Sequence, residues 1–199
     1  QLVVCFALGS QGLSRRARRK LDAPDVLWLE TADAGILSMH KVFQWWRAAA
    51  SGAASFTHAA KVDDDSYLHV PNLLNALSSL ASVPHLVLGG LAHAGYNPQT
   101  FRMCGWQWQR GGAAWRARKC ASRGFSEPFP FPLGALQVLS RSLFRAIGTA
   151  REIRAFAEAA NASADLRKRE SNEDVALGFW VATLAKQGRL NVTFHGVNA

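Results

Sequence analysis

Short apolar runs alternate with longer segments of helical periodicity along most of this 199-residue chain. Apolar runs of strand length predict buried strands at residues 2–8, 25–30, 56–62, 85–91 and 190–197. Apolar residues recur near helical spacing in residues 35–50 and again from Val70 onward, where Pro71 falls in the first turn. Strands that alternate with helices predict an α/β domain with a parallel-rich sheet, whose ligands bind at the carboxyl ends of the strands.

The pattern is less regular between residues 93 and 170. Residues 93–126 are rich in Gly, Trp and Arg and are expected to be irregular, and the prolines that follow predict an extended stretch through 133–135. A helix is expected over 136–147, with Ser140 as a candidate cap. The polar, alanine-rich residues 150–169 predict a helix and a surface loop.

A pair of carboxylates opens the last predicted helix. Ser171 or Asn172 can cap this helix, and Glu173 and Asp174 follow in its first turn. A helix dipole favours negative charge at that end, so capping alone is one explanation of the pair. The alternative is a chemical role for one of the two carboxylates.

Asp63, Asp64 and Asp65 form the most informative cluster of the chain and follow the third predicted strand directly. Adjacent like charges repel, so the cluster costs free energy unless a cation or hydrogen bonds neutralise it. Carboxylate oxygens suit Mg²⁺ or Mn²⁺, and these ions commonly bridge to substrate phosphates. Two interpretations stay open at this point: a metal–diphosphate site at the end of a strand, or a solvated acidic turn.

Composition narrows the range of partners only slightly. With 49% hydrophobic and 19% charged residues the chain is globular, and no apolar run approaches the roughly 20 residues that span a bilayer. The net charge of +9 permits nucleic acid, anionic membranes or phosphorylated small molecules as partners. Much of the excess lies in Arg15–Lys20 and in residues 110–123, and neither run belongs to a nucleic-acid-binding motif. We interpret both as solvated basic loops, with an anion-attracting rim as the alternative, and expect no nucleic-acid partner.

The three cysteines indicate which cellular compartment the chain suits. Cys5 falls in an apolar run and is expected to be a buried thiol. Cys104 and Cys120 bracket the Gly-, Trp- and Arg-rich segment and could close it as a disulfide, which would suit a secretory compartment.

The order of these features resembles the β-1,3-glycosyltransferases of glycosyltransferase family 31, which include the galactosyltransferases and the Fringe-like enzymes. An apolar strand ends in three aspartates, a proline- and glycine-containing stretch follows, and E-D-V-x-x-G opens a helix before a final strand with a histidine. The matching stretches are Phe6-Ala7-Leu8-Gly9, Leu37-Ser38-Met39-His40-Lys41, Lys61-Val62-Asp63-Asp64-Asp65, Pro130 to Arg141, and Glu173-Asp174-Val175-Ala176-Leu177-Gly178.

The resemblance implies a GT-A fold over residues 1–199, a Rossmann-like single domain with a mixed, mostly parallel central sheet flanked by helices. It implies a UDP-sugar donor, Mn²⁺, inversion at the anomeric carbon, and a β-1,3 linkage to a glycan or glycoprotein acceptor. It also implies the Golgi lumen and a type II membrane protein, from which this chain would have been trimmed without its anchor.

By the family pattern, the acidic triplet handles the metal and the donor. Asp65 and Asp63 would ligate the metal, and His195, similar to a histidine near the end of Fringe-like members, would be a third ligand or else a structural residue. Asp63, Asp64 and Lys61 would contact the UDP-sugar.

The second carboxylate pair falls on the acceptor side in this family. Asp174 matches the base that takes the proton from the acceptor hydroxyl, for which one carboxylate within hydrogen-bond reach suffices. Glu173 would orient Asp174 or bind the acceptor, and Gly134 matches a glycine of the acceptor segment. Trp106 could stack on the apolar face of a sugar, with ordinary loop packing as the alternative.

Departures from the family pattern leave the sugar and the acceptor open. The upstream R-x-T-W segment is absent, His40 stands where the family has Lys, and the acceptor segment keeps one glycine. The resulting hypothesis is a metal-dependent inverting hexosyltransferase that transfers galactose or N-acetylhexosamine. The alternative, from another class, is a non-catalytic glycan- or anion-binding domain that kept the fold.

Overall fold

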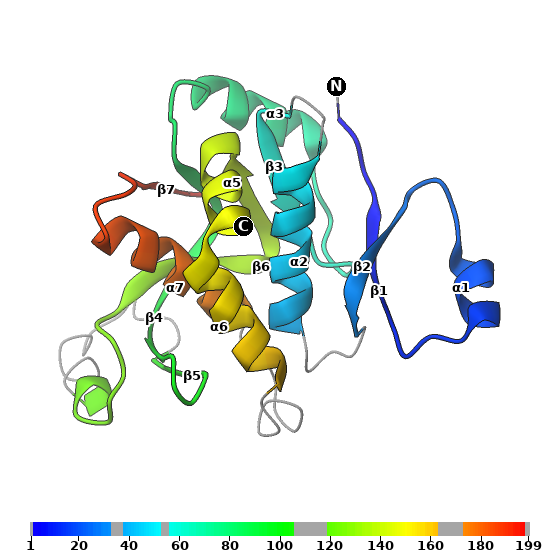
Figure 1. Ribbon diagram of the computed structural model, residues 1–199. Helices are drawn as coiled ribbons and strands as arrows, with labels where there is room; N and C mark the ends of the chain where they lie inside the picture. The colour runs from blue at the N-terminus through cyan, green and yellow to red at the C-terminus, as the bar shows by residue number, and fades with distance from the viewer. Residues whose placement is uncertain (1, 33–37, 53–55, 106–118, 163–172, 198–199) are drawn as a thin grey trace.

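The computed structural model describes residues 2–32, 38–52, 56–105, 119–162 and 173–197. Helices and strands alternate over much of this part of the chain (Figure 1). In chain order they are β1 (Phe6–Gln11), α1 (Arg15–Leu21), β2 (Val26–Ala32), α2 (Ser38–Ser51), β3 (His58–Lys61), α3 (Val70–Ser79), β4 (Leu86–Asn97), β5 (Arg102–Cys104), β6 (Phe129–Ser140), α5 (Arg141–Thr149), α6 (Arg151–Ala162), α7 (Glu173–Lys186) and β7 (Thr193–Gly196).

The strands form a parallel pair, β1 with β2, and a five-stranded sheet. The larger sheet has the order β3-β6-β4, and β5 and β7 both pair with β4. Strands β3, β4 and β7 run in one direction, whereas β6 and β5 run in the opposite one. The predicted mixed α/β architecture is therefore confirmed. Because β6 is inserted between β3 and β4, only β4 and β7 are parallel neighbours in this sheet.

Helices cover both faces of the five-stranded sheet. On one face, α2, α5, α6 and α7 bury the larger hydrophobic core against β4 and β6, with Trp46, Phe131 and Trp180 almost fully enclosed. On the other face, α3 packs Leu73 against Leu88 and Val138. Burial of each large apolar side chain contributes roughly 1.5–3 kcal/mol, so the cores hold the helices firmly on the sheet.

Two segments of the larger sheet differ from the predictions. Strand β4 runs on to Asn97 and β5 follows, where irregular chain was expected. Strand β6 continues to Ser140, so the helix predicted from residue 136 begins only at Arg141. Residues 137–139 pair with β3 on one side and β4 on the other, and this central position overrides their local helical spacing.

The first basic run is a helix, and the predicted loop is wrong there. The Ser14 side chain accepts a hydrogen bond from the Ala17 N–H at 3.1 Å and caps α1. None of its residues is buried, and Arg18 lies 5.1 Å from the centroid of the Trp28 ring. The run is solvated, as expected, but ordered. Most of the second basic run lies outside the described residues.

Helix α7 packs closely against β6. Gly178 of α7 lies against β6, and a Cβ there would come within 2.8 Å of the Pro130 carbonyl oxygen. Only glycine allows the helix to approach this closely. The first turn of α7, which carries the carboxylate pair, is thereby placed over the middle of β6.

Candidate functional site

The acidic triplet forms a turn just beyond the end of β3. The Ser66 N–H donates to the Asp63 carbonyl at 3.1 Å, which places Asp64 and Asp65 at the tip of the turn. Both tip residues are exposed, whereas Asp63 is half-buried. Among the described residues, no side-chain hydrogen bond or ion pair engages Asp64 or Asp65. An exposed acidic turn is thus present at the end of β3, and the metal–diphosphate site at this place stays a prediction.

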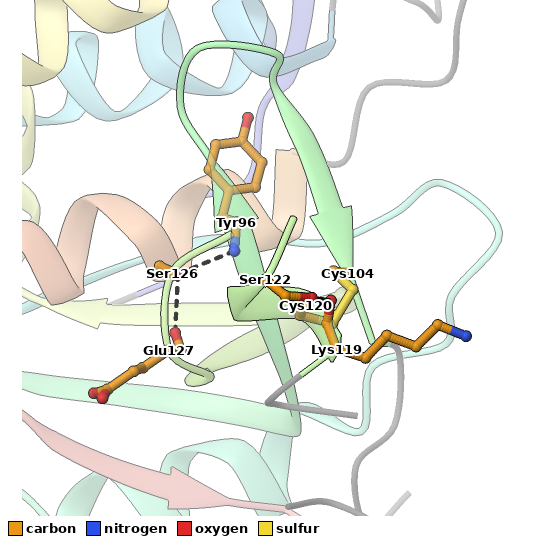
Figure 2. Close-up of a disulfide and its surroundings, with 7 residues drawn as sticks. All are labelled: Tyr96, Cys104, Lys119, Cys120, Ser122, Ser126 and Glu127. Atoms are coloured by element: carbon orange, nitrogen blue, oxygen red, sulfur yellow. Dashed lines mark hydrogen bonds between the residues drawn. A yellow bond between two sulfur atoms is a disulfide. The ribbon is translucent and has the colours of Figure 1, made fainter. Parts of the chain in front are cut away.

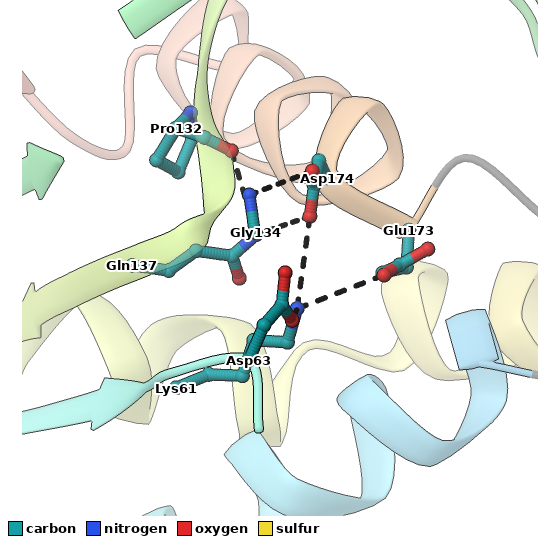
Figure 3. Close-up of polar contacts among 7 residues, drawn as sticks. All are labelled: Lys61, Asp63, Pro132, Gly134, Gln137, Glu173 and Asp174. Carbon is teal, nitrogen blue, oxygen red and sulfur yellow. Dashed lines mark hydrogen bonds and ion pairs between the residues drawn. The ribbon is translucent and has the colours of Figure 1, made fainter. Parts of the chain in front are cut away.

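Asp174 is held by two donors from β6, although it belongs to α7 (Figure 3). The Gly134 backbone N–H donates to Asp174 Oδ2 at 2.7 Å. The Gln137 side-chain amide donates to Asp174 Oδ1 at 2.6 Å and more weakly to the Pro132 carbonyl at 3.4 Å. Each carboxylate oxygen therefore has a donor, and lone pairs remain for a further hydrogen bond.

Lys61 joins the triplet to the carboxylate pair of α7 (Figure 3). Its Nζ lies 2.5 Å from Asp63 Oδ1, 3.6 Å from Glu173 Oε1 and 3.9 Å from Asp174 Oδ1. The Lys61 side chain is only 17% exposed, so these charges interact in a partly water-excluded setting. The structure thereby brings together four residues that the sequence assigned to two separate halves of a site.

Gly134 leaves the space between the two halves free. A Cβ at this position would lie 3.2 Å from each carboxylate oxygen of Asp174 and would collide with Asp63 Oδ2. A larger residue would therefore push the two carboxylates apart or out of place. The glycine that was predicted to bind the acceptor lies between Asp63 of the acidic turn and Asp174 of α7.

The charges of this cluster shift the proton affinities of two members. Burial, with the neighbouring Glu173 charge, raises the pKa of Asp174 to about 6, against the opposing effects of Lys61 and the Gly134 N–H. For Lys61, burial acts to lower the pKa, but the hydrogen bond to Asp63 and the charges of Asp174 and Glu173 outweigh it, and the pKa is raised. Lys61 is thus cationic at neutral pH, and Asp174 is ionised but takes up a proton readily.

The triplet fits a divalent ion that is held by few protein ligands and completes its coordination shell with substrate. Among the described residues, no group of three or more His, Cys, Asp or Glu side chains is arranged to hold a metal. Ions such as Mg²⁺ are commonly held by one or two carboxylates, with substrate phosphates completing the shell. The exposed Asp65 fits that type, whereas Asp63 is already paired with Lys61.

His195 lies apart from this cluster. It is exposed on β7, in register with Leu88 of β4, and shares the sheet face that packs against α3. Lys61 is in register with Gln137, one residue from Val138, and so points to the opposite face. The role of His195 as a third metal ligand stays a prediction, and Trp106 lies outside the described residues.

The predicted disulfide is present: Cys104 at the end of β5 is bonded to Cys120 (Figure 2). It closes a loop between cysteines 16 positions apart, with the Cα atoms 5.8 Å from each other. Hydrogen bonding continues next to it, where the Tyr96 N–H donates to Ser126 Oγ at 3.0 Å. Cys5 is only half-buried, because it precedes β1 and is not inside it.

Gln137 is the site residue that the sequence analysis missed. It is fully buried in β6 and contacts the predicted base. Its signal in the sequence is weak: a single polar residue within an apolar segment. The spacing of that segment predicts a helix, whereas the structure shows a strand.

Comparisons with known proteins add no family assignment: no protein-family model matches the chain, and no curated protein matches it at a significant level. Within the described ranges, none of the helices has the length and apolar character needed to cross a bilayer.

Proposed function

We propose that this chain is a metal-dependent inverting hexosyltransferase of the glycosyltransferase family 31 type. It would transfer galactose or N-acetylhexosamine from a UDP-sugar to a glycan or glycoprotein hydroxyl in β-1,3 linkage. The observation that carries the proposal is the Lys61 cluster, in which one ammonium group joins Asp63 of the triplet to Glu173 and Asp174.

The state of Asp174 suits a general base. A base works best when its pKa lies near the working pH, and the pKa of Asp174 is raised to about 6 by burial. Its side chain remains 17% exposed, so an acceptor hydroxyl can reach it. The hydroxyl proton would pass to the carboxylate, the hydroxyl oxygen would bond to the anomeric carbon, and the bond to the UDP oxygen would break.

The donor half would bind and orient UDP. Lys61 fixes Asp63 near Gly134, and the exposed Asp64 and Asp65 face solvent at the turn. Asp65 would hold Mn²⁺, which when bound supplies positive charge to the departing diphosphate. The disulfide supports an oxidising compartment such as the Golgi lumen.

The test is release of UDP from UDP-galactose and UDP-N-acetylhexosamines, with Mn²⁺ and a panel of glycan acceptors. Wild type is compared with Asp174→Asn, and Glu158→Gln serves as the control because Glu158 pairs with Arg154 on the surface of α6. We expect acceptor-dependent release in wild type and the control, and its loss in Asp174→Asn. Full activity of Asp174→Asn would remove Asp174 as the base.

One observation favours a second candidate, a non-catalytic glycan- or anion-binding domain. The carboxylate of Asp63 is already neutralised by Lys61 at 2.5 Å, which lowers its value as a metal ligand. Calorimetric titration with UDP, with and without Mn²⁺, separates the two candidates. Metal-linked UDP binding supports the transferase, and metal-independent binding without transfer supports the binding domain.

A further inference from the structure

Gln137 carries a polar side chain at a fully buried position of β6. It lies near the C-terminal end of β6 with no exposed surface and points toward the first turn of α7. Its amide nitrogen contacts two acceptors, Asp174 Oδ1 at 2.6 Å and the Pro132 carbonyl at 3.4 Å. Its amide oxygen has no hydrogen-bond partner within the described residues.

The contacts fix the orientation of the Gln137 amide. The reversed amide would set its oxygen against the Pro132 carbonyl and the Asp174 carboxylate, and two acceptors repel. The NH₂ group must therefore face Asp174. This arrangement leaves the other end of the amide buried without a partner, which opposes folding.

Gln137 and Gly134 together contact both oxygens of one carboxylate. The Gly134 N–H holds Oδ2 at 2.7 Å and the Gln137 amide holds Oδ1 at 2.6 Å, both from the same strand. Two donors, one on each oxygen, oppose rotation of the carboxylate plane. The lone pairs that remain point in a fixed direction.

We infer that Gln137 is a positioning residue that holds the Asp174 carboxylate in the one orientation in which it can accept the proton of the acceptor hydroxyl. The inference rests on the proposed function for its chemical meaning. Gln137 touches neither substrate and acts only through Asp174. An apolar side chain of similar size would fill the same space without a buried unpaired oxygen, so packing does not explain the amide.

Two substitutions separate the roles of shape and hydrogen bonding. Gln137→Met keeps the length of the side chain without its donor. Gln137→Glu keeps the shape but replaces the amide donor with a carboxyl group, which donates to Asp174 only while it is protonated. Ser140→Ala is the matched control, because Ser140 is also buried in β6 but donates to the Pro84 carbonyl at 2.7 Å, away from Asp174.

We expect kcat of Gln137→Met and Gln137→Glu to fall about tenfold to a hundredfold, as is typical when a hydrogen-bond partner of an active group is removed. The dissociation constant for UDP with Mn²⁺ should stay within about twofold of wild type, because the donor half is untouched. Ser140→Ala should keep its kcat and lose thermal stability. A kcat of Gln137→Met equal to that of wild type overturns the inference.

Crystal structures of wild type and Gln137→Met provide a readout that does not depend on activity. We expect a single carboxylate orientation at Asp174 in wild type, and a rotated or divided one in the variant. An unchanged orientation overturns the inference even where wild type is active. A rotated carboxylate in a protein without transferase activity contradicts the proposed function instead and leaves the positioning of Asp174 by Gln137 in place.

Discussion

Replacement of Asp174 by asparagine is expected to stabilise the folded protein at neutral pH while it removes activity. Burial first, and the Glu173 charge second, raise the pKa of Asp174 from 3.8 to about 6 in the folded state. The folded protein therefore binds this proton more tightly than the unfolded chain, and its stability falls as pH rises from about 4 to about 6. At 1.36 kcal/mol per pKa unit, the difference between 3.8 and about 6 corresponds to about 3 kcal/mol.

Asparagine carries no charge at any of these pH values, so the penalty disappears in the variant. The favourable effects of Lys61 and of the Gly134 N–H are already included in the raised pKa and do not need to be added. The variant can be accommodated, because the Gln137 amide can turn and present its oxygen to the new NH₂ group. The turn gives up only the weak contact with the Pro132 carbonyl at 3.4 Å and sets two acceptors at that distance.

The assay is urea denaturation of wild type and Asp174→Asn between pH 4 and pH 8, with the disulfide intact and EDTA present. The stability of the variant relative to wild type should rise by about 3 kcal/mol over this range, mostly below pH 6. Glu158→Gln is a control of opposite sign, because the hydrogen bond from Arg154 lowers the pKa of Glu158. A relative stability of Asp174→Asn that does not change with pH would refute the reasoning, since it would show an ordinary pKa in the folded state.

Three further changes test other parts of the structure. Gly134→Ala should abolish transfer and lower the free energy of unfolding by about 1–3 kcal/mol, because its Cβ meets two carboxylates, whereas Gly52→Ala makes only ordinary contacts and should leave both unchanged. Replacing Cys104 and Cys120 together by alanine should lower the free energy of unfolding by about 3 kcal/mol, as reduction of wild type should, and equal urea midpoints would contradict a stabilising disulfide. Burial lowers the pKa of His40, so protonation of this side chain should cost stability as pH falls below about 6.5. The stability of wild type relative to His40→Gln should therefore be lower at pH 5 than at pH 7, and an equal difference between their melting curves at the two pH values would contradict this.

Local apolar patterns and helix-start signals predicted several elements correctly. The strand at 25–30, the helix at 35–50 and the helix that starts near residue 171 all appear close to their expected bounds. Strand β6 was missed in part because its residues acquire strand geometry from two neighbours that lie far away in the sequence. Helical spacing over a few residues is a weak signal beside two rows of backbone hydrogen bonds.

The candidate site was predictable as two halves but not as one cluster. The strand-end rule located the triplet, and the helix start located Glu173 and Asp174. What joins them is the register that sets Lys61 of β3 opposite Gln137 of β6. No local pattern encodes that register, so the contact between Lys61 and Asp174 and the role of Gln137 became visible only in the fold.

Lys61 contacts both the acidic turn and the carboxylate pair of α7, so a substitution in one group affects the other. The Lys61 ammonium group pairs with Asp63 of the acidic turn and lies 3.9 Å from Asp174 of α7. A cation that binds at the triplet and competes with Lys61 for Asp63 would strengthen the attraction between Lys61 and Asp174. Removal of Lys61 would leave the carboxylates of Asp63, Glu173 and Asp174 close together without a neutralising charge. Effects of substitutions at Asp63 and Asp174 should therefore be non-additive, because contact through a shared partner couples them. The acidic turn and the carboxylate pair of α7 form one electrostatic unit, and Lys61 is the residue through which each responds to the other.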